Sequence, residues 1–289
     1  MHQESHAKLS LSNLACRTSD EVYFSIICIT QPTQNCTRVR LIVLRPEQLS
    51  TTQSLSDAIV ISQRHQQNVS AATKKIVVYG SGGHARVLLD IAEACGEFEV
   101  VGCVAQEKIC ELPAPFLGDE SHLPQLLARG VRRAFVAIGD NNDRQRVTAR
   151  VLELGFELVN LISPQAAVSV RVNLGNGIAI MPGVVVNAGT QLEDGCILNS
   201  GAIIDHDCRI GPYSHVASAA ALAGNIELEE GAFVGVGARV IPGIRIGSWT
   251  TVGAGAVVIR DLPSRVTAVG VPAKILRGTT IPDLGGQPA

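Results

Sequence analysis

The 289-residue sequence has few aromatic residues, although hydrophobic residues make up 46% of it. Phenylalanine, tyrosine and tryptophan together account for only 3% of the chain. A conventional globular core of this size uses more aromatic side chains. Small and β-branched residues must therefore fill the interior. With 28 glycines in addition, the composition favours repetitive β structure.

The sequence also lacks an excess of charge and any long apolar run. Its formal net charge is −2, and lysine and arginine form no stripe. Such a chain is not drawn as a whole to nucleic acid or to an anionic membrane, so we expect neither as a partner. No stretch approaches the ~18 uninterrupted apolar residues of a membrane-spanning helix, and none resembles a signal peptide. The expected location is the cytoplasm.

Paired cysteines are missing as well. The eight cysteines are scattered, without a Cys-x-x-Cys pair and without the Cys/His spacing of a zinc site. We expect no metal, and we interpret the cysteines as small buried residues of a protein in a reducing compartment.

Residues 1–73 show no convincing pattern of elements and are treated as a poorly defined N-terminal extension. They are rich in Ser, Thr and Gln, carry apolar patches at Val22–Ile29 and Val39–Leu44, and end in a linker-like polar run, Ser62–Thr73. One hypothesis is a wrongly assigned gene start, the true one lying near Val69. Mass spectrometry of the native N-terminus tests it, because a chain beginning at Met1 would refute it.

Residues 74–162 alternate between strand and helix patterns. This alternation predicts a small parallel sheet with Rossmann-like topology. The predicted strands are Lys75–Tyr79, Phe98–Val104, Ala134–Ile138 and Phe156–Leu161, and the predicted helices are Ala85–Cys95, Leu123–Ala128 and Asp140–Leu154.

The strongest pattern is a repeat of six residues over about 164–260. Every sixth residue is aliphatic without exception, and the residue two places earlier is mostly small. A period of six fits hexapeptide β-helix repeats, in which three hexapeptides form one triangular coil. The aliphatic positions are Val168, Leu174, Ile180, Val186, Leu192, Leu198, Ile204, Ile210, Val216, Leu222, Leu228, Val234, Val240, Ile246, Val252 and Val258.

The fold class predicted from this repeat is a left-handed parallel β-helix, preceded by the small Rossmann-like α/β domain. Parallel crossovers are usually right-handed, so the left hand is taken from the hexapeptide repeat itself. Glycine and asparagine are expected at the corners, where positive φ angles occur. We place the β-helix at residues 163–277 and a C-terminal tail at residues 278–289.

A glycine-rich turn, Gly80-Ser81-Gly82-Gly83-His84, follows the first predicted strand of the α/β domain and opens a helix. Backbone N–H groups at such a helix start suit phosphate groups. An NAD site would have an acidic residue after the second strand, but the sequence there is Gly102-Cys103-Val104-Ala105-Gln106. NAD binding at this turn is therefore disfavoured.

One histidine in the repeat has the surroundings of a general base. His206 lies in the segment Ile204-Asp205-His206-Asp207, between two aliphatic positions, so its ring is expected to project outward from the coil. Imidazole is suited to base catalysis near neutral pH, and flanking carboxylates would raise its basicity. On the residues alone, a solvated polar turn explains Asp-His-Asp equally well.

The hexapeptide array, its ending Gly270-Val271-Pro272-Ala273-Lys274, and the turn Tyr79-Gly80-Ser81-Gly82-Gly83-His84-Ala85 resemble one protein family. Residues 74–277 are similar to the bacterial hexapeptide-repeat sugar acetyltransferases, which include nucleotide-linked amino-sugar N-acetyltransferases and sialic-acid O-acetyltransferases. The resemblance implies a homotrimer, a site between adjacent prisms, acetyl-CoA as co-substrate and no metal.

The resemblance also implies roles for individual residues. His206 would be the general base and Asp207 its carboxylate partner, with the Gly224 N–H stabilising the oxyanion. Acetyl-CoA would contact His215, Val236 and Ala254. The nucleotide-sugar would contact Gly80, Ser81, Gly82, Gly83 and His84. Gly139, Asp140, Asn141 and Arg144 lie at the next strand-to-helix junction and are expected from the topology to face the same crevice, with Asp140 and Asn141 as further substrate contacts.

The predicted function is acetyl transfer to the amine of a nucleotide-linked 4-amino-sugar. The main alternative is O-acetylation of sialic acid or another sugar, because one base serves either acceptor. A third interpretation is a non-catalytic β-helix that binds nucleotide-sugars. A free-thiol assay against a panel of amino-sugar nucleotides separates the three.

Overall fold

The computed structural model describes residues 73–276 in full and, before them, the backbone of three strands. These are β1 (Leu14–Arg17), β2 (Tyr23–Pro32) and β3 (Thr37–Leu44), which form an antiparallel sheet in the order β1-β2-β3. The chain divides into two units, residues 1–72 and 73–289. The predicted linker before Thr73 and the predicted C-terminal tail lie outside the described residues. The ranges not described are 1–13, 18–22, 33–36, 45–72 and 277–289.

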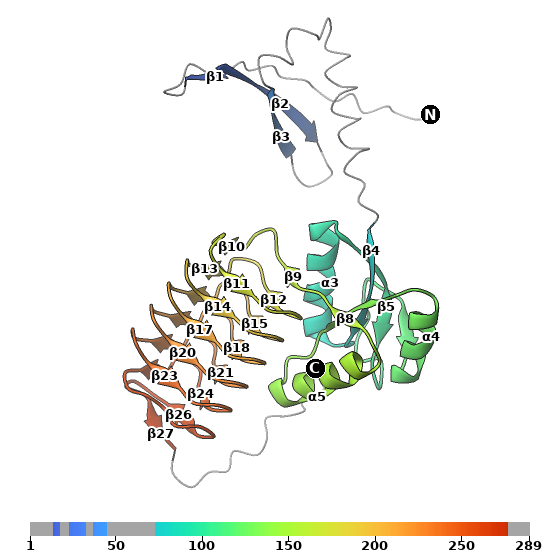
Figure 1. The fold of residues 1–289 in the computed structure, drawn as a ribbon. Coiled ribbons are helices and arrows are strands. Elements are labelled where there is room, and N and C mark those ends of the chain that lie inside the picture. Colours follow the sequence, from blue (N-terminus) through green and yellow to red (C-terminus); the bar gives the residue numbers. More distant parts are fainter. Residues whose placement is uncertain (1–13, 18–22, 33–36, 45–72, 277–289) are drawn as a thin grey trace, which may run out of the picture. The chain divides into compact units, whose positions relative to one another are not determined.

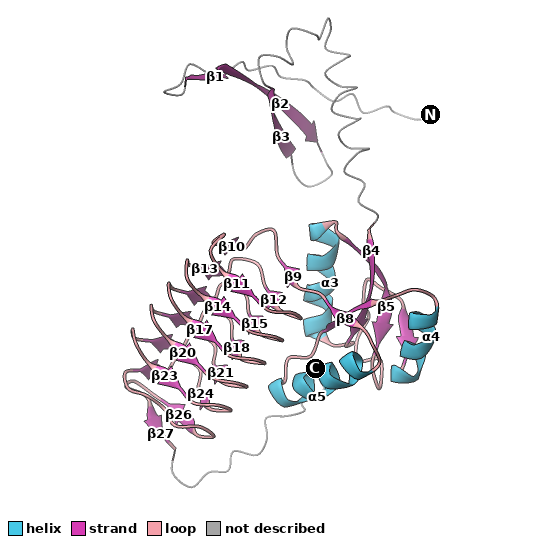
Figure 2. Ribbon diagram, viewed as in Figure 1, coloured by secondary structure: helices cyan, strands magenta, loops and turns pink. Residues whose placement is uncertain are grey.

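The second unit begins with the α/β domain, whose five strands form one parallel sheet in the order β6-β5-β4-β7-β8 (Figures 1 and 2). Its elements are β4 (Lys74–Tyr79), α3 (Gly83–Cys95), β5 (Phe98–Val104), β6 (Phe116–Gly118), the 3-10 turn η1 (Glu120–His122), α4 (Leu123–Ala128), β7 (Arg133–Val136), α5 (Asn141–Glu153) and β8 (Glu157–Leu158).

The alternation of side chains along β4 explains why the sheet is covered on both faces. Ile76 and Val78 belong to the same core cluster as Leu88 of α3. Val77 and Tyr79 point the other way and pack with residues of α4 and α5. Both faces of β4 are therefore apolar, as expected for a central parallel strand.

The predicted hexapeptide repeat forms a left-handed β-helix built from very short strands. From β9 to β22 each strand pairs in parallel with the third strand after it, as Val168 of β10 does with Val186 of β13, and Val186 with Ile204 of β16. Each coil therefore contains three hexapeptides. At the end of the array β24 pairs with β26, and β26 pairs antiparallel with β27. The strands are β9 (Leu161–Ile162), β10 (Ala167–Val168), β11 (Asn173–Leu174), β12 (Ala179–Ile180), β13 (Val185–Val186), β14 (Gln191–Leu192), β15 (Ile197–Leu198), β16 (Ile203–Ile204), β17 (Arg209–Ile210), β18 (His215–Val216), β19 (Ala221–Leu222), β20 (Glu227–Leu228), β21 (Phe233–Val234), β22 (Arg239–Val240), β23 (Arg245–Ile246), β24 (Thr251–Val252), β25 (Val257–Val258), β26 (Thr267–Val269) and β27 (Lys274–Ile275).

The second residue of each strand from β10 to β25 is the aliphatic residue of the repeat, and it lines the prism. Ile180, Leu198 and Val216 are inaccessible to solvent. The first coil is the exception: Val168 is only half-buried and Leu174 has 40% of its surface exposed, because β10 and β11 each pair with one strand alone and lie at the end of their stacks. The small residue two places earlier is also buried wherever a coil lies on each side.

Every sixth residue from Gly177 to Gly255 turns a corner of the prism in the left-handed conformation, with a positive φ. Glycine occupies most of these positions and Asn225 another, as the repeat predicts. Asp207, Tyr213 and Trp249 also hold positive φ angles of 59°, 56° and 58°. The stacked coils thus impose a conformation that these side chains adopt only at a cost.

The prism has three outer faces of different character. The sheet that starts at β9 forms the covered face, whose outward residues Ala179, Ile197 and His215 are buried although they point away from the prism. The sheet from β11 to β23 forms the charged face, where Arg209 lies between Glu193 and Glu227. The sheet from β10 to β25 forms the apolar face, with the outward residues Ala167, Val185, Ile203, Ala221, Arg239 and Val257.

The α/β domain lies against the covered face and shares its core with the β-helix (Figure 1). One cluster of buried residues runs from Leu88 and Leu89 of α3 to Ala179 and Ile197 of the prism. Near this junction the Cys95 thiol donates a hydrogen bond to the Ile162 carbonyl at 3.0 Å. Within residues 73–276, no helix is long and apolar enough to cross a membrane.

Candidate functional site

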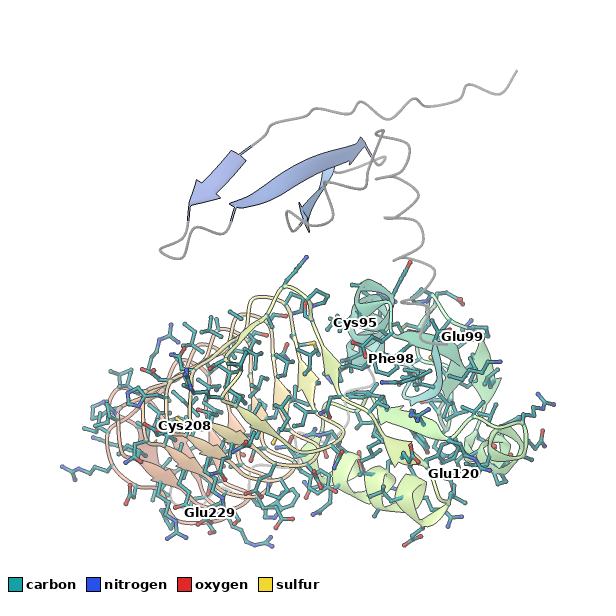
Figure 3. The ribbon with its side chains drawn as sticks, turned by 45° about the horizontal axis from the view of Figure 1, so that its top comes forward. Cys95, Phe98, Glu99, Glu120, Cys208 and Glu229 are labelled. Atoms are coloured by element: carbon teal, nitrogen blue, oxygen red, sulfur yellow. The ribbon has the colours of Figure 1, made fainter. Side chains whose placement is uncertain are left out.

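His206 lies at the corner between β16 and β17, where the apolar face meets the charged face. Its side chain is 61% exposed, so the ring projects outward, as the sequence predicts. Its Nδ1 lies 2.9 Å from Oδ2 of Asp207. The nearby residue Cys208 points back into the prism and is buried (Figure 3).

Asp205 shapes this corner. One of its carboxylate oxygens accepts hydrogen bonds from the His206 N–H at 2.8 Å and from Nδ2 of Asn187 at 2.9 Å. Asn187 lies one coil earlier, so Asp205 ties two neighbouring corners together. The bond from Asn187, followed by the bond from His206, lowers the pKa of Asp205. Asp205 is therefore a charged, structural carboxylate.

Asp207 is the partner of the imidazole. A carboxylate only accepts hydrogen bonds, so Nδ1 of His206 carries the proton and Nε2 keeps its lone pair. The hydrogen bond to Asp207, and then the charge of Asp205, raises the pKa of His206 above its usual value. The corner thus presents an exposed imidazole in the tautomer of a general base.

Gly224 lies one coil after His206, at the same corner. A Cβ atom on Gly224 would lie 2.6 Å from Cε1 and 2.7 Å from Nε2 of His206, so the ring occupies the space that a side chain would need. The Gly224 N–H makes no hydrogen bond to any described residue. Its predicted role as an oxyanion donor stays a prediction.

Val236 and Ala254 lie at a different corner, where the covered face meets the apolar face. They stack directly, since the Gly255 N–H donates to the Val236 carbonyl at 2.8 Å. Both are exposed, and Val236 has 56% of its surface open to solvent. A single chain therefore does not bring these predicted acetyl-CoA contacts together with His206.

His215 is buried beneath the α/β domain, with 8% of its surface exposed. Its Nδ1 lies 3.3 Å from the Gly139 carbonyl oxygen, and its Nε2 lies 3.3 Å from Nδ2 of Asn199. Its ring meets the Phe233 ring edge-on, with centroids 5.2 Å apart. Burial, and then the charge of Arg144, lowers the pKa of His215 to about 3, so the imidazole is neutral.

The glycine-rich turn leads from β4 into α3. Gly80 has a φ of 142°, and a Cβ there would lie 2.5 Å from the Ala137 carbonyl oxygen, so the close approach of the chain after β7 requires glycine. Gly82 is the N-cap of α3, and no side chain caps this end. The first N–H groups of α3, next to Gly83, are therefore free of a side-chain cap and suit an anion.

Ser81 and His84 of this turn differ in their surroundings. The Ser81 hydroxyl donates to the Glu107 carbonyl at 2.7 Å and accepts from the Ile109 N–H at 3.2 Å, so it anchors the loop after β5. Nε2 of His84 is buried without a hydrogen-bond partner among the described residues. Burial, and then the nearby Arg144, lowers the pKa of His84 to about 4.

Asp140 and Asn141 hold α5 in place. The Asp140 carboxylate caps the helix by accepting from the Asp143 N–H at 2.9 Å. Asn141 is buried, and its Nδ2 donates to the Gly231 carbonyl of the β-helix at 3.0 Å. Both side chains thus have structural partners, and the substrate contacts predicted for them stay predictions.

Arg144 does not face an open crevice, contrary to the expectation from the sequence. Only 1% of its surface is exposed, and every acceptor of its guanidinium is a backbone carbonyl or the Asn141 amide oxygen. The contact of Asn199 with His215 is a further feature that sequence reasoning missed. The repeat could have predicted this contact, because Asn199 precedes His215 by almost one full coil of the β-helix and so lies beside it.

The described residues contain no cluster of three or more His, Cys, Asp or Glu side chains able to hold a metal ion. A groove of about 400 Å³ opens on the α/β domain, lined by Gln106, Asp119, Glu120, Ser121, Pro124, Arg150 and Leu154 (Figure 3 labels Glu120). This groove belongs to the α/β domain, whereas His206 belongs to the β-helix.

Comparison with known proteins gives matches to both parts of the second unit. The PglD N-terminal domain family matches residues 75–151. A GDP-perosamine N-acetyltransferase of Escherichia coli O157:H7 is 31% identical over 135 residues, which are 47% of this chain and 53% of that protein.

Two solved structures extend the similarity over the β-helix. PerB from Caulobacter crescentus, solved with CoA and GDP-perosamine, is 50% identical; the match covers 71% of this chain and 98% of that one, with a TM-score of 0.68. The acetyltransferase domain of PglB from Neisseria gonorrhoeae is 35% identical, with coverages of 70% and 100% and a TM-score of 0.66.

Proposed function

The chain belongs to the hexapeptide-repeat sugar acetyltransferase family, and we propose that it transfers the acetyl group of acetyl-CoA to the amine of a GDP-linked amino-sugar. The Caulobacter relative, which binds CoA and GDP-perosamine, matches this chain over 98% of its own length at 50% identity. That similarity supports a GDP-sugar of the perosamine type as the acceptor.

The reaction needs a base on the amine and a proton for the departing sulfur. Nε2 of His206 takes a proton from the acceptor nitrogen as that nitrogen forms its bond to the thioester carbonyl carbon. The same proton then passes to the sulfur as the C–S bond breaks, which leaves an amide and free CoA. Asp207 holds Nδ1 of the ring throughout, so the imidazolium is stabilised while it exists.

The observation that carries the proposal is the exposed His206–Asp207 pair, with Nε2 free of any partner among the described residues. Its surroundings add two features. The Gly224 N–H lies on the next coil beside the ring and would face the oxygen on which negative charge develops. The uncapped start of α3 beside Gly83 would receive the diphosphate of the nucleotide-sugar.

We propose that the complete site forms between subunits of a homotrimer. The His206 corner and the corner of Val236 and Ala254 border the same apolar face, from opposite sides. That face carries Ile203, which is 46% exposed in the single chain. Packing the face against a neighbouring prism would bury this surface and bring the His206 corner of one subunit toward the Val236 corner of the next.

A free-thiol release assay tests the proposed activity. We expect CoA release with GDP-perosamine as acceptor, and little with UDP-linked amino-sugars or with sugars that offer only hydroxyl groups. His206→Ala should lower kcat by about 10²–10⁴-fold. Its acetyl-CoA affinity and fold should stay unchanged, because the ring points outward. Transfer to sialic acid, or full activity of His206→Ala, would contradict the proposal.

A further inference from the structure

The corner formed by residues 223–226, which carries Gly224, is closed by a side chain of the coil before it. In this corner the Cys208 sulfur lies between the first carbonyl and the last N–H of the turn. It accepts a hydrogen bond from the Ile226 N–H at 3.5 Å and lies 3.2 Å from the Ala223 carbonyl oxygen. No backbone N–H of the described residues donates to that carbonyl. The Cys208 side chain therefore takes the place of a backbone hydrogen bond.

A second corner offers a direct comparison. There the Ser214 N–H donates directly to the Gly211 carbonyl at 3.2 Å. The Cys196 thiol also reaches this carbonyl, at 3.1 Å, but it adds to a backbone hydrogen bond that already exists. The same thiol–carbonyl contact thus occurs at both corners, and the Ala223 carbonyl depends on it more.

The corner of His206 is built like the corner of Gly224, with a hydroxyl in place of the thiol. Oγ1 of Thr190, one coil earlier, accepts from the Cys208 N–H at 3.3 Å and donates to the Asp205 carbonyl at 2.9 Å. A hydroxyl therefore suits this position of the repeat as well as a thiol does.

The thiol proton of Cys208 is directed at the Ala223 carbonyl. Burial raises the pKa of this thiol, so the sulfur keeps its proton. The other carbonyl in reach, that of His206, is farther away at 3.7 Å and already accepts the Asn225 N–H at 2.9 Å. Because Cys208 is only 1% exposed and points into the prism (Figure 3), the Ala223 carbonyl must point inward to meet it.

The direction of this carbonyl determines the direction of the Gly224 N–H. Ala223 and Gly224 share one trans peptide plane, in which the C=O and N–H groups point in opposite directions. An inward carbonyl turns the Gly224 N–H outward, to the exposed side of the corner where the His206 ring lies. Glycine adopts positive and negative φ angles with similar ease. Position 224 by itself therefore does not keep this peptide from turning over.

We propose that Cys208 is a positioning residue: its buried thiol anchors the Ala223 carbonyl and so keeps the Gly224 N–H directed at the oxyanion that forms during acetyl transfer. This rests on the proposed function, in which the Gly224 N–H is the oxyanion donor. Cys208 thus acts from inside the prism, without touching either substrate.

Infrared spectroscopy tests the anchor without any acetyl transfer. The difference between the spectra of the unmodified protein and Cys208→Ser isolates the S–H stretching band of Cys208. We expect this band below the frequency of a thiol that makes no hydrogen bond. A band at the frequency of a free thiol would refute the anchor, whereas absence of CoA release from the unmodified protein would refute the proposed function.

Kinetics of three variants test the positioning role. Cys208→Ala should lower kcat about 10–100-fold and change the acetyl-CoA KM less than about twofold, because the oxyanion exists only in the transition state. Cys208→Ser keeps a donor and should restore kcat to within about threefold of the unmodified value. Cys196→Ala is the matched control, since its carbonyl partner keeps a backbone hydrogen bond, and its kcat should stay unchanged. Equal kcat values for the two alanine variants, or no recovery in Cys208→Ser, would overturn the proposal.

Discussion

His206 and Asp207 lie next to each other in the chain, yet their side chains meet because the corner is left-handed at Asp207. The φ of 59° at Asp207 accompanies a distance of 2.9 Å between its Oδ2 and Nδ1 of His206. Residues that adjoin on an extended strand point to opposite sides. Two consecutive residues therefore form a hydrogen-bonded acid–base pair only because the backbone turns a left-handed corner at Asp207.

The pH dependence of the reaction should depend on this pair. The hydrogen bond to Asp207 raises the pKa of His206, and the base works only when its Nε2 is unprotonated. Activity should rise with pH through that raised pKa. Asp207→Asn removes the charge, so the pKa of His206 should fall and the acidic limb of the kcat profile should move to lower pH. The plateau should drop at the same time, because the imidazolium loses its partner.

A pH titration of kcat for both proteins measures this shift. Asp205→Asn is the matched control, because Asp205 bonds the His206 backbone and Asn187 instead of the ring. It should move the limb less than Asp207→Asn does. An acidic limb at the same pH in all three proteins would show that His206 is not the titrating base.

Glycine is required at position 224 because the His206 ring occupies the space that a side chain there would need. The φ of Gly224 is not positive, so alanine meets no backbone strain, but the new Cβ would lie 2.6–2.7 Å from the His206 ring. The ring is exposed and can swing away, so Gly224→Ala should leave the thermal midpoint almost unchanged. Its kcat should fall by roughly 10²-fold, since the base is displaced from the reacting nitrogen. A variant with normal kcat would show that the ring works from another position.

At the scale of elements, the sixfold pattern predicts the prism well because each coil repeats the same local requirement. All strands from β10 to β25 occur where the aliphatic positions place them. The α/β strands and helices follow too, and β5 and α4 keep the predicted bounds. The short strand β6 was missed, because so brief a segment has no periodicity and depends on its pairing with β5.

The burial of His215 and Arg144 could not be predicted from the sequence, for a related reason. Both are polar residues at positions that a single β-helix or a single helix would leave at its surface. They are buried only because the α/β domain packs on the covered face. Contacts between segments far apart in the chain, such as His215 with Gly139, leave no local trace in the sequence. The exposed His206, in contrast, depends on its own corner and was predicted.

Substitutions at the third corner of the prism, where the charged face meets the covered face, test how tightly the coils stack. Trp249 packs on Gly231, and a Cβ on Gly231 would come within 2.4–2.6 Å of the indole. Gly231 also has a φ of 65°. Gly231→Ala therefore combines left-handed strain, worth about 1–2 kcal/mol, with a clash against a large side chain, worth about 1–3 kcal/mol.

Gly237→Ala is the control that separates these two costs. Its φ of 68° is similar, but nothing lies within 4 Å of the added Cβ. It should lose only the strain contribution, so urea titrations should show Gly231→Ala to be the less stable variant. An equal loss of unfolding free energy in the two variants would mean that the Trp249 side chain moves aside without cost.

At the scale of the whole molecule, the predicted site residues of the prism, apart from the buried His215, are divided between two of its corners. His206 and Gly224 lie where the apolar and charged faces meet, whereas Val236 and Ala254 lie where the apolar and covered faces meet. In the proposed homotrimer, a rotation that places the apolar face against a neighbour would join one corner of each kind at every interface. Ile203→Asp, in the middle of that face, should then reduce both the sedimentation coefficient and the activity.

Complementation between inactive variants tests the shared site more stringently. His206→Ala removes the base from one corner, and Val236→Trp blocks the opposite corner with a bulky ring. Each variant alone should be nearly inactive. In a randomly mixed trimer an intact site needs a Val236→Trp subunit to supply His206 and a His206→Ala subunit to supply Val236. This combination occurs at about a quarter of the interfaces. Co-refolded equal mixtures should therefore recover about a quarter of the unmodified activity, whereas sites confined to single chains would recover none.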